Sequence, residues 1–110
     1  MMHVNDLVKK ISALQRSDLE AWIREELVTP RHEAGAPLFT DMECARVGLI
    51  CTLHYELEID AETLPVVLSL VDQLYDTRHR LLSLTAAVAA QDTDIQAKII
   101  AAMSSYRRRL

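Results

Sequence analysis

Residues 17–43 read SDLEAWIREELVTPRHEAGAPLFTDME, and this stretch decides the expected fold. Ser17 and Glu20 have the spacing of a capping box, in which the hydroxyl and the carboxylate each satisfy a backbone amide at a helix start. The apolar residues that follow recur at helical spacing: Leu19, Trp22, Ile23 and Leu27. We therefore expect a helix that begins near Ser17, buries Trp22 in the core and is stopped by Pro30.

The segment 30–39 separates that helix from the next one. It contains two prolines and one of the chain's two glycines, so it predicts an irregular hairpin or wing, and Pro37 fits only an edge strand. Thr40 and Glu43 form a second capping box and open a third helix that is apolar almost all round. Such a helix is expected at the centre of the molecule.

Helices are also expected on both sides of this stretch. Asn5 is placed to cap a short first helix. After a link at residues 56–60, Asp60 or Thr63 caps a helix that runs from Leu64 to about residue 90. Thr93 and Gln96 form a third capping-box pattern ahead of a terminal helix that ends at residues 107–109, all arginine.

The predicted fold class is all-α, and its parts are a helix–turn–helix with a wing (residues 1–60) and a long helix with a terminal helix (residues 61–110). With 110 residues, the chain is expected to form one compact domain. Two glycines and three prolines leave few sites for β-turns, and the chain has only five aromatic residues. This composition disfavours a β-sandwich or a β-barrel.

Several function classes are disfavoured by what the sequence contains. Cys44 and Cys51 lie seven residues apart in a helical pattern, which separates them too far for a disulfide, so both are expected as small buried side chains in a reducing compartment. No metal-ligand cluster, phosphate-binding glycine loop or activated nucleophile is evident, and we expect no enzyme activity, metal or cofactor. Without a membrane-spanning run, a cytoplasmic location is expected.

Two segments carry a family resemblance. Residues 18–31 (DLEAWIREELVTPR), with Gly35 to Phe39 and Thr40-Asp41, resemble the DNA-binding domain of MerR proteins, which are winged helix-turn-helix proteins. Residues 53–60 (LHYELEID), 64–74 and 80–82 are similar to chaperone-modulator proteins of the CbpM type within that superfamily. The similarity covers roughly residues 5 to 85 and consists of many weak matches.

The charges depart from a MerR-type DNA reader. Where that family's wing usually carries an arginine, this chain has Ala36, Pro37 and Leu38. Residues 1–45 hold five basic and eight acidic side chains, and the whole chain has a formal charge of −4. Because phosphate contacts by basic residues supply most DNA affinity, direct DNA binding is disfavoured. A dimeric MerR-like regulator of promoter DNA remains the alternative.

The resemblance to chaperone modulators implies a protein partner. Such proteins bind the J-domain of a DnaJ-like (CbpA-type) co-chaperone and inhibit its stimulation of a DnaK-type chaperone. J-domains dock on DnaK through a basic helix, so acidic side chains of this chain are candidates for the contact. They are Asp18, Glu20, Glu25, Glu26, Glu56, Glu58 and Asp60. The cluster at residues 18–26 also has a simpler role available, since acidic residues in a first turn stabilise the helix dipole and Glu20 has a capping role.

The long helix suggests a second copy as partner. A helix approaching 25 residues exceeds the usual length in globular domains and is typical of one that packs on a partner helix. Its apolar stripe includes Leu64, Val67, Val71, Leu74 and Leu81. Periodicity alone leaves open whether this stripe is core or a homodimer interface.

Overall fold

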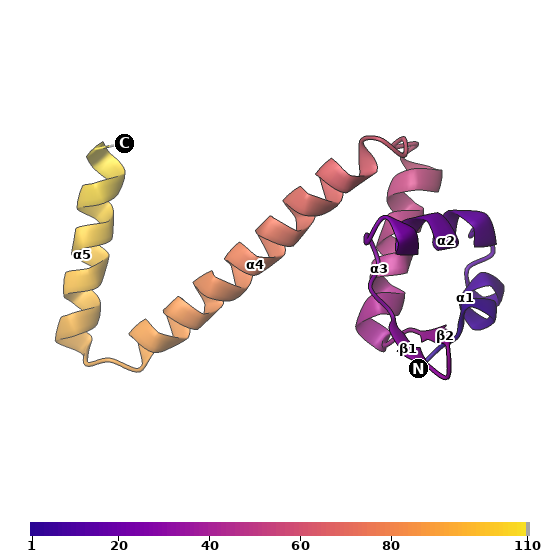
Figure 1. Ribbon diagram of the computed structural model, residues 1–110. Coiled ribbons are helices and arrows are strands. Elements are labelled where there is room, and N and C mark those ends of the chain that lie inside the picture. Colours follow the sequence, from indigo (N-terminus) through magenta and orange to yellow (C-terminus); the bar gives the residue numbers. More distant parts are fainter. Residues whose placement is uncertain (110) are drawn as a thin grey trace. The chain divides into compact units, whose positions relative to one another are not determined.

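The computed structural model describes the backbone of residues 1–109 and the side chains of residues 1–107. The protein is mainly helical, with five α-helices and one two-stranded sheet in the described chain. The elements follow in the order α1 (Val4–Lys10), α2 (Arg16–Arg24), β1 (Arg31–Glu33), β2 (Ala36–Leu38), α3 (Asp41–Cys51), the π-helical turn η1 (Thr52–Glu56), α4 (Leu64–Ala89) and α5 (Thr93–Arg109) (Figure 1). They form two units, Met1–Leu70 and Val71–Leu110.

The hydrophobic core lies in the first unit. It joins α1, α2, the end of the hairpin, α3 and the first turns of α4. Trp22 is only 4% exposed, which confirms the prediction that it is a core residue. The most deeply buried side chains are Leu7, Leu19, Val28, Phe39, Val47, Ile50, Leu64 and Leu68.

The hairpin predicted between Pro30 and Thr40 is present. β1 and β2 pair antiparallel, with His32 opposite Pro37, and a two-stranded sheet consists of edges, where proline is tolerated. Ala34 and Gly35 form the turn at φ values of 52° and 77°, the left-handed pair that two-residue hairpin turns use. Met2 then pairs with Phe39 through two backbone hydrogen bonds of 2.9 and 2.7 Å, which fastens the N-terminus to the end of the hairpin.

The starts of the first two helices differ from the prediction. Asn5 lies inside α1, and the cap is His3, whose backbone amide donates to Asp6 Oδ2 at 3.0 Å. Ser17 lies inside α2, which begins at Arg16 after Gln15, so the predicted Ser17–Glu20 capping box is wrong. The end of α2 is also earlier than Pro30, because Glu26 adopts a left-handed φ of 60°.

The start of α3 is as predicted. The Thr40 hydroxyl accepts a hydrogen bond from the Glu43 amide, and Glu43 Oε1 accepts one from the Thr40 amide, each at 3.3 Å. At its C-terminal end α3 widens into η1, where the Leu57 amide donates to the Thr52 carbonyl five residues earlier. Single π-turns of this kind are uncommon and are often found at functional sites.

The long helix and the terminal helix are present with altered caps. α4 ends within one residue of the predicted position, and the Asp60 carboxylate accepts from the Thr63 amide at 2.7 Å just before it begins. The predicted Thr93–Gln96 capping box is wrong, because Thr93 is already helical. The Gln96 side chain instead donates to the carbonyls of Ala89 and Gln91 at the end of α4.

Among the described residues, no helix combines the length and the apolar composition needed to cross a membrane.

Candidate functional site: an acidic surface around an aromatic cluster

An aromatic cluster holds α2 against η1. The Trp22 ring contacts His54 edge-on with ring centroids 6.1 Å apart, and it contacts Tyr55 at 6.2 Å. His54 and Tyr55 are themselves 5.1 Å apart. Trp22 contributes the buried apolar surface, whereas the two rings from η1 are half-buried and carry polar atoms. The position of α2 is therefore set by residues more than thirty positions later in the chain.

The Tyr55 hydroxyl replaces the predicted capping box. It accepts from the Gln15 amide at 3.1 Å and donates to Asp18 Oδ2 at 2.6 Å, so one oxygen contacts both the N-cap and the first turn of α2. Burial, followed by the hydrogen bond to Asp18, raises the pKa of Tyr55 to about 12. The Asp18 carboxylate is thus committed to a structural bond and is half-buried.

His54 closes the turn that follows η1. Its Nδ1 lies 2.8 Å from the Ile59 carbonyl oxygen, and since a carbonyl can only accept, Nδ1–H is the donor. The Ile59 amide donates in turn to the Leu53 carbonyl at 2.9 Å. Between these bonds Glu58 adopts a left-handed φ of 55°, a conformation that costs a residue with a side chain on the order of 1 kcal/mol.

The four α2 carboxylates do not form one patch. Asp18 faces Tyr55, whereas Glu20 lines a hollow of about 400 Å³ whose other walls include His3 and Arg16, with Pro37 of β2. Glu25 and Glu26 are exposed at the far end of the helix.

The three predicted carboxylates after α3 lie on the turn that His54 closes. Glu56 and Glu58 are exposed to solvent. Asp60 is exposed too, but its bonds to the Thr63 side chain and amide lower the pKa of its carboxyl group. Glu56 directly follows Tyr55, so the Tyr55–Asp18 bond places the start of α2 next to this turn. The seven residues lie at several separate places on the first unit, and the name acidic surface is used below for all of them together.

The first unit as a whole is acidic. Residues 1–70 hold six basic and twelve acidic side chains, whereas residues 71–110 hold six basic and four acidic ones. From the start of α2 to the end of the hairpin (residues 16–38), three arginines stand against five carboxylates, and the Arg16 guanidinium donates to the Asn5 side chain. These residues offer no excess of positive charge to a nucleic acid phosphate.

The apolar stripe of α4 divides between core and surface. Leu64 is 1% exposed and belongs to the core of the first unit, and Val67 packs against that core. Val71 is half-buried, and beyond it Leu74 and Leu81 are 71% and 59% exposed. Only the distal part of the predicted interface is therefore uncovered.

The sequence reasoning missed the contacts that organise this surface. His54 and Tyr55 lie in the segment 53–60 that carries the family resemblance, but no pattern there predicted their contacts, and the Tyr55–Asp18 bond spans 37 residues, beyond the reach of local periodicity. Cys44 and Cys51 are both free thiols, and burial raises the pKa of Cys51 to about 11. Within the described chain, no group of three or more histidine, cysteine or acidic side chains is placed to hold a metal ion.

No protein-family profile, curated protein or solved structure matches this chain.

Proposed function

We propose that this protein is a chaperone modulator that binds the J-domain of a DnaJ-like co-chaperone and inhibits its stimulation of a DnaK-type chaperone. The observation that supports it most is the acidic surface on an acidic unit of the chain. J-domains use a basic helix to dock on DnaK, and opposite charges would steer the two proteins together and compete for that helix. We place the first unit in the winged helix-turn-helix class, with α1, α2 and α3 as its helices and β1–β2 as its wing.

Two backbone conformations add support. Glu26 and Glu58 both adopt left-handed φ values, at 60° and 55°, where glycine or asparagine would be more stable. A strained residue is retained most readily where its side chain has a task. Both strained glutamates belong to the acidic surface, so the strain favours a binding role for their carboxylates.

The primary test is calorimetric titration of the full chain with the purified J-domain of its host's DnaJ-like proteins, at low and moderate salt. Saturable binding that weakens with salt is expected. The double variant Glu25→Lys with Glu56→Lys should weaken binding at least about tenfold and flatten the salt dependence. The control, Glu33→Lys with Asp94→Lys, changes the net charge equally outside the acidic surface and should bind as the parent does.

A second test uses the strained residues. Glu26→Gly and Glu58→Gly should each raise the free energy of unfolding by about 0.5–1 kcal/mol because they relieve a left-handed side-chain conformation. Ala34→Gly, at a φ of 52°, should stabilise similarly and serves as the matched control. Loss of J-domain affinity in the two glutamate variants, with none in Ala34→Gly, supports the proposal.

The alternative is a promoter-binding regulator. The order of α2, the hairpin and the long helix α4 favours it, whereas the acidic net charge of the first unit disfavours it. Fluorescence anisotropy with duplex DNA distinguishes the two. Tight, salt-dependent DNA binding without any J-domain complex would replace the proposed function with this one.

A further inference from the structure

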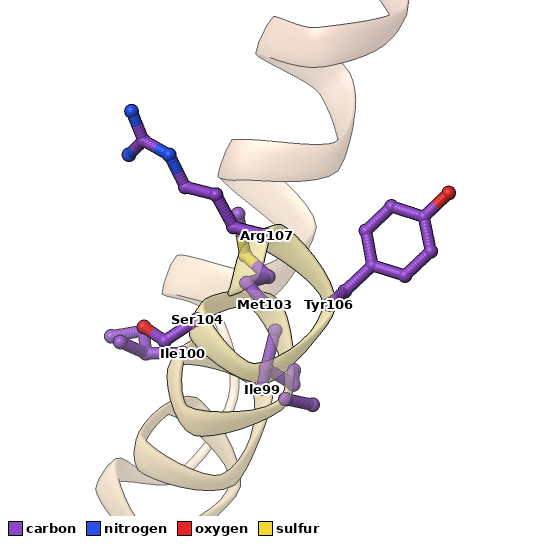
Figure 2. A pocket seen from close by; sticks show the side chains of 7 residues that line it. Ile99, Ile100, Met103, Ser104, Tyr106 and Arg107 are labelled. Carbon is purple, nitrogen blue, oxygen red and sulfur yellow. The ribbon is translucent and has the colours of Figure 1, made fainter. Parts of the chain in front are cut away.

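The polar groups of the turn after η1 are held more firmly than those of the hollow beside α5. In that hollow, Ser104 and Tyr106 point to opposite sides of a single helix and converge on no common point (Figure 2). In the turn, by contrast, hydrogen bonds of 2.7–3.0 Å fix the chain on both sides of Glu58. Fixed geometry favours binding because less conformational freedom is lost when a partner docks. The turn therefore has the better-defined binding geometry.

The backbone of the turn is bonded to η1 on both sides of Glu58. The Leu57 amide donates to the Thr52 carbonyl at 3.0 Å, and the Ile59 amide donates to the Leu53 carbonyl at 2.9 Å. The Ile59 side chain also packs against the core of the first unit. Glu58 lies between these bonds at a φ of 55°, so its left-handed conformation is imposed by its neighbours.

The His54 side chain provides the bond that crosses the turn. Its Nδ1–H donates to the Ile59 carbonyl at 2.8 Å. Two neighbours set the direction of the ring, since Trp22 contacts it edge-on at 6.1 Å and Tyr55 lies 5.1 Å away. Because the ring is held by the aromatic cluster, the carbonyl that it binds is held as well. His54 therefore links the packing of α2 to the backbone beside Glu58.

A turn without this bond would rarely keep the same conformation. Residues with side chains have a positive φ in only a few per cent of cases. Releasing the Ile59 carbonyl would therefore let the turn populate conformations in which Glu58 is not left-handed. The carboxylates of Glu56, Glu58 and Asp60, all exposed on this turn, would then lose their present arrangement.

We infer that His54 is a positioning residue for J-domain binding, because its bond to the Ile59 carbonyl holds residues 56–60 in the conformation that binds. The inference rests on the proposed function and adds to it a residue outside the acidic surface. The bond changes the population of the binding conformation and leaves every carboxylate in place, so it does not alter the charge attraction between the two proteins.

The size of the effect follows from that population. When only a fraction of the molecules has the binding conformation, the apparent dissociation constant rises by the inverse of that fraction. An unrestrained residue with a side chain would be left-handed a few per cent of the time, but the bond from Ile59 to Leu53 keeps part of the restraint. We expect loss of the His54 bond to raise the dissociation constant about 5- to 20-fold.

Three substitutions of His54 separate its hydrogen bond from the packing of its ring. His54→Phe keeps an aromatic ring against Trp22 and removes the donor. His54→Asn and His54→Gln both lose the ring, but the asparagine amide reaches the position of Nδ1, whereas the longer glutamine amide reaches that of Nε2. Of the three, the asparagine variant alone keeps a donor for the Ile59 carbonyl. Trp22 fluorescence and circular dichroism check that each variant is folded.

Calorimetric titration of the full chain with the J-domain, at two salt concentrations and at pH 8, where an imidazole is ordinarily neutral, tests the inference. The phenylalanine and glutamine variants should bind about 5- to 20-fold more weakly than the parent with the same salt dependence, and the asparagine variant should bind within about twofold of it. The ¹⁵N chemical shifts of the parent's His54 ring should show the Nδ1–H tautomer.

Parent-like affinity of His54→Phe, or equal losses in the asparagine and glutamine variants, would overturn the inference and leave the proposed function standing. The Nε2–H tautomer in the parent would overturn it as well, because Nδ1 would then have no proton to donate. If the parent itself binds no J-domain, the proposed function fails, and the role of His54 in binding fails with it.

Discussion

Removing the Tyr55 hydroxyl should destabilise the first unit through a single pair of hydrogen bonds. The oxygen donates to Asp18 at 2.6 Å and accepts from the Gln15 amide at 3.1 Å. A hydrogen bond to a charged group contributes about 1.5–3 kcal/mol, and the lower half of that range applies here because both side chains are only half-buried. We expect Tyr55→Phe to lower the free energy of unfolding by about 1.5–2 kcal/mol.

Urea unfolding followed by Trp22 fluorescence measures this value, since the tryptophan is buried in the same unit. A double-mutant cycle with Asp18→Ala isolates the bond, and the coupling energy should be about 1 kcal/mol or more. Additive losses from the two substitutions would refute the reasoning, because they would mean that the two side chains do not interact. Tyr75→Phe, whose ring is 59% exposed on α4, is the control and should change stability little.

The pH dependence of stability tests the same contact. The pKa of Tyr55 is raised from 10 to about 12, so its contribution is fully present below pH 10. It is lost as the pH rises toward 12, because the unfolded chain ionises first. Tyr55→Phe should abolish this part of the alkaline loss, and an unchanged pH profile would contradict the assignment.

Three other outcomes are expected. Thr40→Ala should cost about 1 kcal/mol because it removes the cap of α3, whereas Ser17→Ala should cost almost nothing in urea unfolding; equal costs would restore the predicted capping box at Ser17. Ala34→Asn should stabilise the hairpin by about 0.5–1 kcal/mol, since asparagine accepts the left-handed conformation before Gly35; a loss of stability in thermal unfolding would contradict that turn geometry. Cys44 should react with a disulfide reagent at pH 8 far faster than Cys51, which is 6% exposed and has a pKa of about 11; equal rates would show that the core opens readily.

The elements that sequence reasoning predicted well are those set by local chemistry. The Thr40–Glu43 capping box uses groups three residues apart, and the hairpin around Gly35 follows from turn residues that favour left-handed φ values. The long helix α4 was predicted from its apolar periodicity and from a cap at Asp60 or Thr63. In each case the interacting groups are close in the sequence, so the local pattern is sufficient to predict the element.

The start of α2 was mispredicted because the deciding group is distant in the sequence. Ser17 and Glu20 have the right spacing, but the Tyr55 hydroxyl reaches the Gln15 amide and draws the helix start to Arg16. The end of α2 has a similar cause: Glu26 takes a left-handed φ, and the Leu27 carbonyl accepts from Arg46 Nε of α3 at 2.6 Å. Tertiary contacts therefore override the capping signals at both ends of this helix.

The apolar stripe of α4 shows why a periodic sequence pattern cannot identify the surface that packs against it. Leu64 and Leu74 occupy the same stripe and differ in nothing that the sequence displays, yet one is 1% exposed and the other 71%. Apolar residues at helical spacing indicate that one face of the helix is buried, but they do not identify the surface that buries it. The core of the first unit ends at Leu68, so Leu74, Leu81 and the apolar residues of α5 lie outside it.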